Sequence, residues 1–355
     1  MRAALALTLC LIGCAGERPA IGVNRRPAPV PRVDVSDAPP DLDSTGLYLP
    51  GSRTIARDVY AYKPAFELWS DGATKARWIH LPPHTKVDVS DMNEWIFPVG
   101  TKLWKEFRVP VRGRLRRVET RLLWKTAEDQ WVRAVYAWSQ DESRATVLTA
   151  GIDQVPGTNG YAIPPQTACV QCHAGRIDGV LGFEAILLAA PEAEGLDYDE
   201  LLRRGWLDGG EREPAPSSGL QIPGVDIERR ALGLLHVDCG VSCHHARGGA
   251  THFETRLVVD AEGHVGSVEA TRVYRTAVNA PSKLRPAGAA PDAATFYRIR
   301  PADPAKSTVL YTMRVRDAPG TNVREQMPPL ASKRPDEEGA RTIEAWIRQM
   351  SAPAH

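Results

Sequence analysis

Cys169-Val170-Gln171-Cys172-His173 is the stretch around which the rest of the chain is organised. Two cysteines separated by two residues, with a histidine directly after the second, form the attachment signature of c-type haem. The two thiols add to the two vinyl groups of the porphyrin, whose separation this spacing matches, and the histidine ligates the iron. The stretch therefore predicts a covalent haem on Cys169 and Cys172, with His173 as an axial ligand.

A second stretch, Cys239-Gly240-Val241-Ser242-Cys243-His244, repeats the pattern with one extra residue between the cysteines. The extra residue has to be absorbed by a bulge in the turn. With that bulge, the stretch predicts a second covalent haem on Cys239 and Cys243, ligated by His244. His245 is one residue out of phase, and we expect it at the surface or beside a haem propionate.

Cysteine usage supports attachment, because four of the six cysteines lie in these two motifs and the other two, Cys10 and Cys14, lie near the N-terminus. Three other interpretations remain open. A thioredoxin-like redox pair is disfavoured because no βαβ pattern surrounds Cys169. The four motif cysteines together could bind zinc. Cys239 and Cys243 could instead form a disulfide without haem.

The second axial ligands are predicted from the surrounding sequence. Met327 lies in a Met-Pro-Pro loop before the last helical stretch, and a thioether opposite histidine raises the reduction potential of a haem. Met327 is therefore the predicted ligand of the second haem, with Met313 as the alternative. For the first haem, His236, Met92 and an open position all remain candidates, although His236 also fits a helix-packing role. An open position would permit ligand chemistry.

The N-terminus has the pattern of an exported protein. Ala3 to Gly13 is an apolar run after a positive start, and it is too short to span about 30 Å of hydrocarbon as a helix. We therefore expect a signal peptide in residues 1–14. Leu11-Ile12-Gly13-Cys14 resembles the bacterial lipobox, which predicts lipidation of Cys14. Ordinary signal cleavage near Ala15-Gly16 is the alternative.

Residue 15 is Ala rather than the Asp that favours inner-membrane retention, so the expected location is periplasmic and anchored to the outer membrane through Cys14. Residues 15–44 are rich in Pro, Ala, Arg and Asp and predict a disordered tether.

Residues 45–150 are predicted to form a β domain. Stretches 117–125 and 132–138 alternate between apolar and polar side chains, and shorter candidate strands lie at 76–81, 95–98 and 103–109. Many short strands favour a sandwich or barrel-like domain. Seven of the nine tryptophans fall between Trp69 and Trp138, which indicates core packing or, alternatively, carbohydrate binding.

The remaining chain is predicted to be mainly helical. Residues 151–223 form the first haem-attachment region, with short helices at 182–190 and 198–204. Residues 224–355 are predicted as a cytochrome c-like domain that carries the second motif. A helix at 227–235 leads into the motif, an extended β segment is inserted at 255–300, and a helix at 336–350 ends the domain. The fold class expected is multidomain α+β.

The net charge of +1 gives no reason to expect nucleic acid as a partner. The basic stretch 112–121 is best explained as the solvated face of a strand pair, and a docking patch for an acidic redox partner is the alternative.

Taken together, the chain resembles a family of bacterial diheme c-type cytochromes, often lipoprotein-like, with an N-terminal β domain. The resemblance covers roughly residues 45–350. The stretches that carry it are ELWSDGATKARWIHLP (67–82), FPVGTKLWKEF (97–107), ETRLLWK (119–125), IPPQTACVQCH (163–173), VLGFEAI (180–186), LLHVDCGVSCHH (234–245) and MPPL (327–330).

The resemblance implies two covalently attached haem c groups and electron transfer with periplasmic redox partner proteins. It gives Cys169, Cys172 and His173 the role of first-haem ligands, and Cys243 and His244 that of second-haem ligands. The resemblance also assigns Cys239 to the second haem, although this motif has one more residue between its cysteines than the regular motif. An electron-transfer protein is expected rather than an enzyme. The alternatives are a diheme peroxidase-like oxidoreductase with one open haem site, and a carbohydrate-binding β domain with an accessory haem module.

Overall fold

The computed structural model describes residues 37–250, 253–289, 295–317, 325–329 and 332–352. The predicted signal peptide, its lipidation site Cys14 and the predicted tether up to residue 36 lie outside the described residues, as does Leu330 of the Met-Pro-Pro-Leu stretch.

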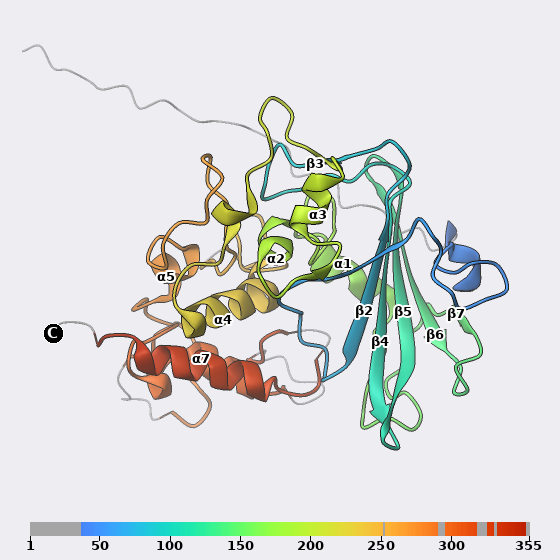
Figure 1. The fold of residues 1–355 in the computed structure, drawn as a ribbon. Helices are drawn as coiled ribbons and strands as arrows, with labels where there is room; N and C mark the ends of the chain where they lie inside the picture. The colour runs from blue at the N-terminus through green and yellow to red at the C-terminus, as the bar shows by residue number, and fades with distance from the viewer. Residues whose placement is uncertain (1–36, 251–252, 290–294, 318–324, 330–331, 353–355) are drawn as a thin grey trace, which may run out of the picture. The chain divides into compact units, whose positions relative to one another are not determined.

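Seven strands form one antiparallel sheet in the order β7-β6-β5-β4-β2-β1-β8 (Figure 1). Its strands are β1 (Tyr60–Lys63), β2 (Thr74–His80), β4 (Lys102–Val111), β5 (Arg114–Ala127), β6 (Gln130–Trp138), β7 (Ala145–Val147) and β8 (Glu194–Gly195). A separate parallel pair joins β3 (Val87–Asp88) to β9 (Leu207–Asp208). The alternating stretches thus become β2, β4, β5 and β6, as predicted, and the predicted strand at 95–98 contributes only an isolated bridge through Ile96.

The sheet is open, with β7 and β8 at its edges, which differs from the predicted sandwich or barrel. A second sheet is not needed because other parts of the chain cover both faces. One face carries Trp78, Trp104 and Tyr136, which pack against the buried side chains of Leu42 and Leu47.

Residues 37–44, the last part of the predicted tether, therefore belong to the folded structure. The Leu42 amide donates a hydrogen bond to the Ala145 carbonyl over 3.0 Å, and Asp41 forms a bridge with Thr146 of β7. A single buried leucine is enough to hold this otherwise polar segment on the sheet edge.

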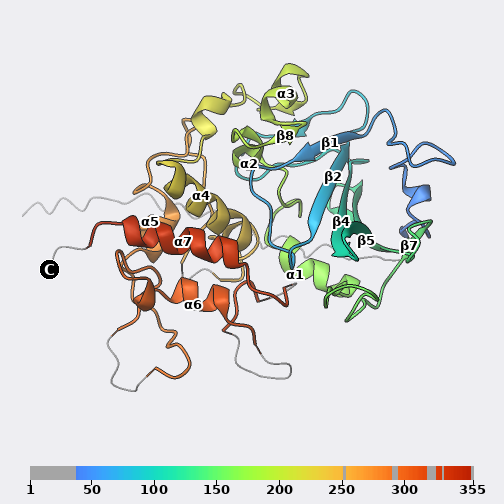
Figure 2. The ribbon, with the colours of Figure 1, turned by 60° about the horizontal axis from the view of Figure 1, so that its bottom comes forward.

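Seven α-helices among the described residues complete the mixed α+β fold (Figure 2). They are α1 (Cys169–His173), α2 (Ala185–Ala189), α3 (Tyr198–Arg203), α4 (Asp226–Leu235), α5 (Arg272–Ala277), α6 (Thr308–Arg314) and α7 (Glu337–Gln349). Short 3₁₀ turns lie at η2 (Asp43–Thr45), η3 (Gln166–Ala168), η4 (Ser217–Leu220) and η6 (Pro304–Lys306), and the segment η5 (His236–Gly240) is π-helical. The predicted helices at 182–190, 198–204, 227–235 and 336–350 are confirmed as α2, α3, α4 and α7.

Helix α7 packs on α4, as both ribbon views show (Figures 1 and 2). It begins where the Asp336 side chain accepts a hydrogen bond from the Gly339 amide over 2.9 Å, and Glu337 and Glu338 complement the helix dipole. Its buried face includes Ile343 and Trp346.

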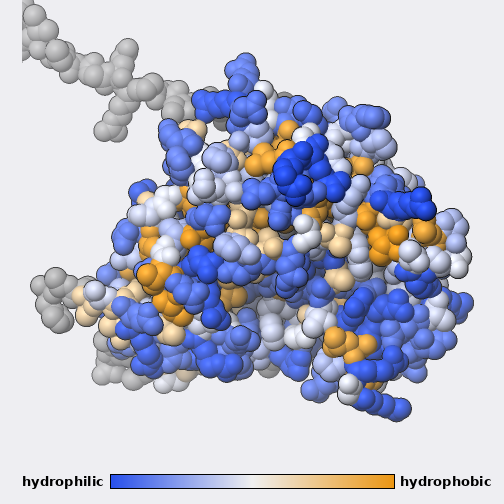
Figure 3. All heavy atoms as spheres, viewed as in Figure 1, coloured by the Kyte–Doolittle hydropathy of each residue, from blue (hydrophilic) through white to orange (hydrophobic). Residues whose placement is uncertain are grey.

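The face seen in Figure 3 is mainly hydrophilic, with hydrophobic side chains in small separate groups. Among the described residues, no helix is both long enough and apolar enough to cross a bilayer.

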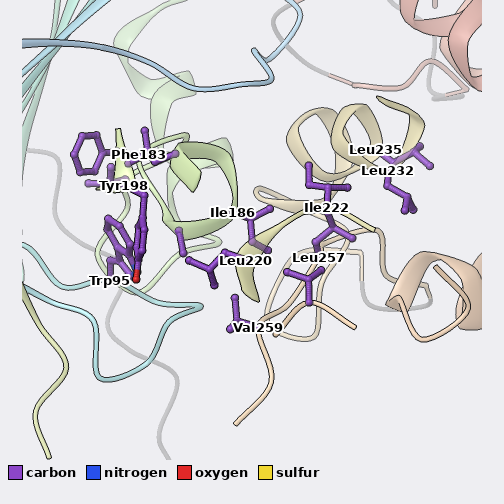
Figure 4. Close-up of a cluster of buried hydrophobic side chains, with 14 of the residues drawn as sticks. Trp95, Phe183, Ile186, Tyr198, Leu220, Ile222, Leu232, Leu235, Leu257 and Val259 are labelled. Carbon is purple, nitrogen blue, oxygen red and sulfur yellow. The ribbon is translucent and has the colours of Figure 1, made fainter. Parts of the chain in front are cut away.

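The largest apolar cluster runs from the sheet to the helices (Figure 4). At one end Trp95, Phe183 and Tyr198 pack together, and Phe183 meets Trp95 edge-on with 6.0 Å between ring centroids. At the other end lie Leu232 and Leu235 of α4. The segments that carry the two cysteine motifs thus share one core with the sheet.

The predicted β insertion at 255–300 is wrong for the residues that the structure describes there. These residues form helix α5 and isolated bridges, such as Val278 with Ile299, instead of a regular strand. Apolar residues such as Leu257 and Val259 suggested a strand, but each is buried in the main core as a separate anchor.

Candidate functional site

The first cysteine motif forms the short helix α1, which leads into a loop at 174–180. The Nδ1–H of His173 donates a hydrogen bond to the Gly179 carbonyl over 2.5 Å. A carbonyl oxygen only accepts, so the proton lies on Nδ1 and the lone pair lies on Nε2. Burial lowers the pKa of His173 to about 4. The ring is therefore neutral near pH 7 and has the tautomer that metal-binding histidines adopt.

The loop after α1 is fixed to the sheet by Asp178. Its buried carboxylate pairs with Lys125 Nζ at 2.8 Å and accepts hydrogen bonds from the Trp131 indole at 2.9 Å and from the Phe97 amide at 2.6 Å. These three contacts hold the Gly179 carbonyl, and with it the His173 ring, in a defined position relative to β5 and β6.

A cavity of about 330 Å³ opens beside α1. Cys169, Cys172 and His173 lie in its wall together with residues of β2, β4, β5 and β6 and with residues of the second motif. Among the described residues that line it, His173 is the only histidine and there is no methionine. Apolar lining residues include Phe66, Leu103, Leu123, Val180, Val237 and Val241.

The second motif continues α4 as a π-helical segment. The Val241 amide donates to the His236 carbonyl over 2.9 Å, and the His244 amide donates to the Cys239 carbonyl over 2.8 Å. Both hydrogen bonds span five residues instead of four. A π-type turn accommodates one extra residue, so the predicted bulge is confirmed.

The second cavity, of about 560 Å³, is lined by Cys239 and His244 and also by Met313 and Met327. The Met327 amide is held by the Thr312 carbonyl over 2.8 Å. The predicted ligand and its alternative are thus brought to the same cavity as the histidine. Cys243 is not among the residues that line it.

A buried network of charges joins the segments around both motifs. Arg176 pairs with Glu184 and, over 3.1 Å, with Glu94, and Arg256 pairs with Glu94 over 2.6 Å. Buried pairs of this kind cost several kcal/mol to break at one partner. The network therefore fixes the loop after α1 relative to the residues that follow the second motif.

His236 belongs to this network. Its Nδ1 accepts a hydrogen bond from the Leu257 amide over 3.0 Å, so its Nε2 carries the proton and donates to Glu184 over 2.6 Å. Both ring nitrogens are used, and the helix-packing role fits better than an iron ligand. Met92 packs against the main core and lines neither cavity.

The two motifs touch each other. A Cβ atom on Gly175 would come within 2.3 Å of the Ser242 carbonyl oxygen, so only glycine allows this approach. His245 lies against the same glycine and is buried, with 3% of its surface exposed. Its predicted surface position is therefore wrong, and a position beside a haem propionate stays a prediction.

The four described cysteines are free thiols. Burial raises the pKa of each, most strongly for Cys239, which disfavours the thiolates that zinc requires. The described residues contain no group of three or more His, Cys, Asp or Glu side chains able to hold a metal ion. In the described residues the four cysteines therefore do not converge on one metal site, and Cys239 and Cys243 are separate thiols.

Sequence reasoning missed the residues that position the site, namely Glu94, Arg176, Asp178, Glu184 and Arg256. Their partners lie far away in the chain, and no spacing rule links them. In the sequence, only the closeness of Arg176 and Asp178 to the first motif could have indicated that they position the site.

No protein-family model matches the chain, and no curated protein or solved structure is significantly similar to it. The interpretation of the site therefore depends on its own residues and geometry.

Proposed function

We propose that this chain is a two-haem c-type cytochrome that transfers electrons outside the cytoplasm. The observation that carries the proposal is that each cysteine motif lies in the wall of its own cavity, with a histidine beside it. Haem iron cycles between ferrous and ferric states and so supplies a one-electron carrier.

The donor residues fit this assignment. Cys169, Cys172 and His173 would hold the first haem, and His173 already has the tautomer of an iron ligand. Cys239, Cys243 and His244 would hold the second haem, with Met327 as its second axial ligand. Attachment at Cys243 requires its thiol to turn toward the second cavity.

The chain order in the second half supports a cytochrome c-like arrangement. Helix α4 leads directly into the second motif, Met327 lies in a later loop, and α7 packs back on α4. In this arrangement the helices exclude water from the cavity while the loop brings a thioether to it.

Contact between the motifs supports electron transfer from one haem to the other. Gly175 lets the two segments meet, and Val237, Val241 and Ser242 of the second segment line the first cavity. The charge network keeps this spacing rigid, which limits the reorganisation that accompanies a change in charge.

A peroxidase-like oxidoreductase is the second candidate, and one observation favours it. Because no methionine and no histidine besides His173 lines the first cavity among the described residues, a haem there could keep an open position. Rapid reaction of the reduced protein with hydrogen peroxide would support this candidate, and unreactive haems would exclude it. Carbohydrate binding has less support, since five of the seven tryptophans between Trp69 and Trp138 are buried.

We also propose export and lipid anchoring at Cys14, with periplasmic redox proteins as partners. Replacing Cys14 with Ser should release the protein into the soluble fraction. Continued association of that variant with the outer membrane would mean that another element anchors it.

The test of the main proposal is a pyridine haemochrome assay combined with the intact mass of the mature protein. Two haems per chain are expected. One haem would restrict the function to a single-haem carrier, and none, in a host able to mature c-type cytochromes, would refute it.

A further inference from the structure

Three cations meet in register on the sheet face that lines the first cavity. Arg77 of β2 lies opposite Lys105 of β4, and Lys105 lies opposite Arg121 of β5, on three neighbouring strands (Figure 1). All three side chains line the cavity. Like charges directly opposite one another destabilise a sheet, so this basic row requires anions nearby.

The outer two members of the basic row already have carboxylate partners. Arg77 pairs with Glu67, and Arg121 pairs with Glu119 over 2.7 Å. Among the described residues, the Lys105 side chain has no carboxylate within 4.0 Å and no hydrogen bond. Its Nζ lies 5.3 Å from the centroid of the Phe107 ring. Burial and the neighbouring Arg77 hold the pKa of Lys105 well below its usual value, so the centre of the row lacks the anion that would stabilise its positive charge.

A second unpaired cation, Arg133 of β6, lines the same cavity. Only 2% of its surface is exposed, its Nε has no hydrogen-bond partner, and its guanidinium donates one long hydrogen bond, to the Trp131 carbonyl at 3.5 Å. The cavity-lining carboxylate of Asp71 is occupied by the backbone amides of Lys333 and Arg334. A buried guanidinium without a counter-ion costs several kcal/mol.

We propose that Lys105 and Arg133 bind the two propionate carboxylates of the first haem. A porphyrin carries two such carboxylates, and the cavity wall has two cations that lack a partner. This inference depends on the proposed function, because it requires a haem on Cys169 and Cys172. The inference gives the sheet a role in setting the reduction potential of the first haem, because each nearby positive charge favours the ferrous over the ferric state.

The test compares Lys105→Gln and Arg133→Gln with Lys102→Gln in the full-length protein. Lys102 is the matched control because it lies on the same strand, lines neither cavity, and donates to the Thr45 carbonyl over 2.8 Å. Lys105→Arg and Arg133→Lys retain the charge and serve as rescue variants. Haem content, reduction potentials and the propionate bending bands in resonance Raman spectra are measured for each.

Both glutamine variants should keep two haems, shift the propionate bands and lower the potential of one haem. The expected change is on the order of tenfold in the ratio of oxidised to reduced haem, or about 59 mV for a one-electron couple. Lys102→Gln should match the wild type, and the rescue variants should recover most of the shift. If Arg133→Gln does not fold, Lys105→Gln still decides the proposal.

Two haems with unchanged bands and potentials in the glutamine variants would overturn the inference and leave the proposed function intact. Conversion of one haem from six- to five-coordinate in both Lys105→Gln and Lys105→Arg would also overturn it, because Lys105 would then be an iron ligand. If the reduction potentials of the wild type change when acetate is added, the basic row binds a soluble anion instead of the haem propionates. A wild type without haem on Cys169 and Cys172 would refute both proposals.

Discussion

The two cavities differ in what faces the histidine. In the first, a regular CxxCH turn places His173 opposite a sheet face that carries cations. In the second, a π-helical CxxxCH turn places His244 in a cavity with two thioethers, Met313 and Met327. Under the proposed function, the chain would build two unlike redox sites, one tuned by charge and the other by ligand type.

Replacing the histidines tests whether the two sites load independently. His173→Ala and His244→Ala should each lose one haem, or about half of the haem content, because each motif supplies its own attachment signature. Haemochrome assays measure the loss. His264→Ala, whose side chain is 61% exposed, is the control and should keep two haems. Loss of both haems in either variant would show that the sites depend on each other.

Met327→Leu tests whether the second haem has a thioether ligand that the first haem lacks. Loss of the thioether should lower the potential of one haem by on the order of 0.1 V and change its spectrum, and the other haem should stay as it is. Met92→Leu is the control, since Met92 lines neither cavity. A wild-type spectrum in Met327→Leu together with an altered one in Met313→Leu would transfer the ligand role to Met313.

Gly175→Ala should disturb the contact between the two sites. The new Cβ would lie 2.3 Å from the Ser242 carbonyl oxygen, so the backbones must separate, at a cost of about 1–3 kcal/mol in the free energy of unfolding. Chemical denaturation measures this cost. Gly249→Ala is the control because nothing lies within 4 Å of the added atom. Equal stability of the two variants would contradict the described packing.

Asp238, beside the second motif, should make the stability of the protein depend on pH. Burial raises its pKa to about 7, although the Trp69 amide donates to it over 2.8 Å. The folded protein then holds this proton more tightly than the unfolded chain, whose aspartates titrate near pH 4. The stabilisation is complete below pH 4 and is lost as the pH rises through about 7.

Asp238→Asn should remove that pH dependence, which is on the order of 3 kcal/mol between pH 4 and 7. Unfolding curves at several pH values measure it, with the exposed Asp129→Asn as the control. An Asp238→Asn protein that retains the wild-type slope would assign the dependence to other groups.

The sequence predicted those parts whose signals are local. Helices α4 and α7 and strands β4, β5 and β6 follow from periodicity, and Met327 follows from a short loop motif before a helix. The basic row could not be predicted, because Arg77, Lys105 and Arg121 meet only through strand register. Strand β8 has two residues and is defined by its partner β1, so it leaves no periodic signal.

The predictions from sequence were wrong where a single apolar residue, instead of a periodic run, attaches a segment to the core. Leu42 draws the end of the predicted tether onto the sheet, and Leu257 and Val259 anchor a segment that was predicted to be a β insertion. From the sequence alone, such residues cannot be distinguished from strand residues, because their role depends on the core against which they pack.

The most direct test of the account is to map haem onto peptides of the mature protein by mass spectrometry. The account predicts two haem-bearing peptides, one containing Cys169 and Cys172 and the other containing Cys239 and Cys243. Haem on the first peptide alone, with unmodified thiols at Cys239 and Cys243, would contradict the claim that the π-helical turn makes the longer motif competent for attachment.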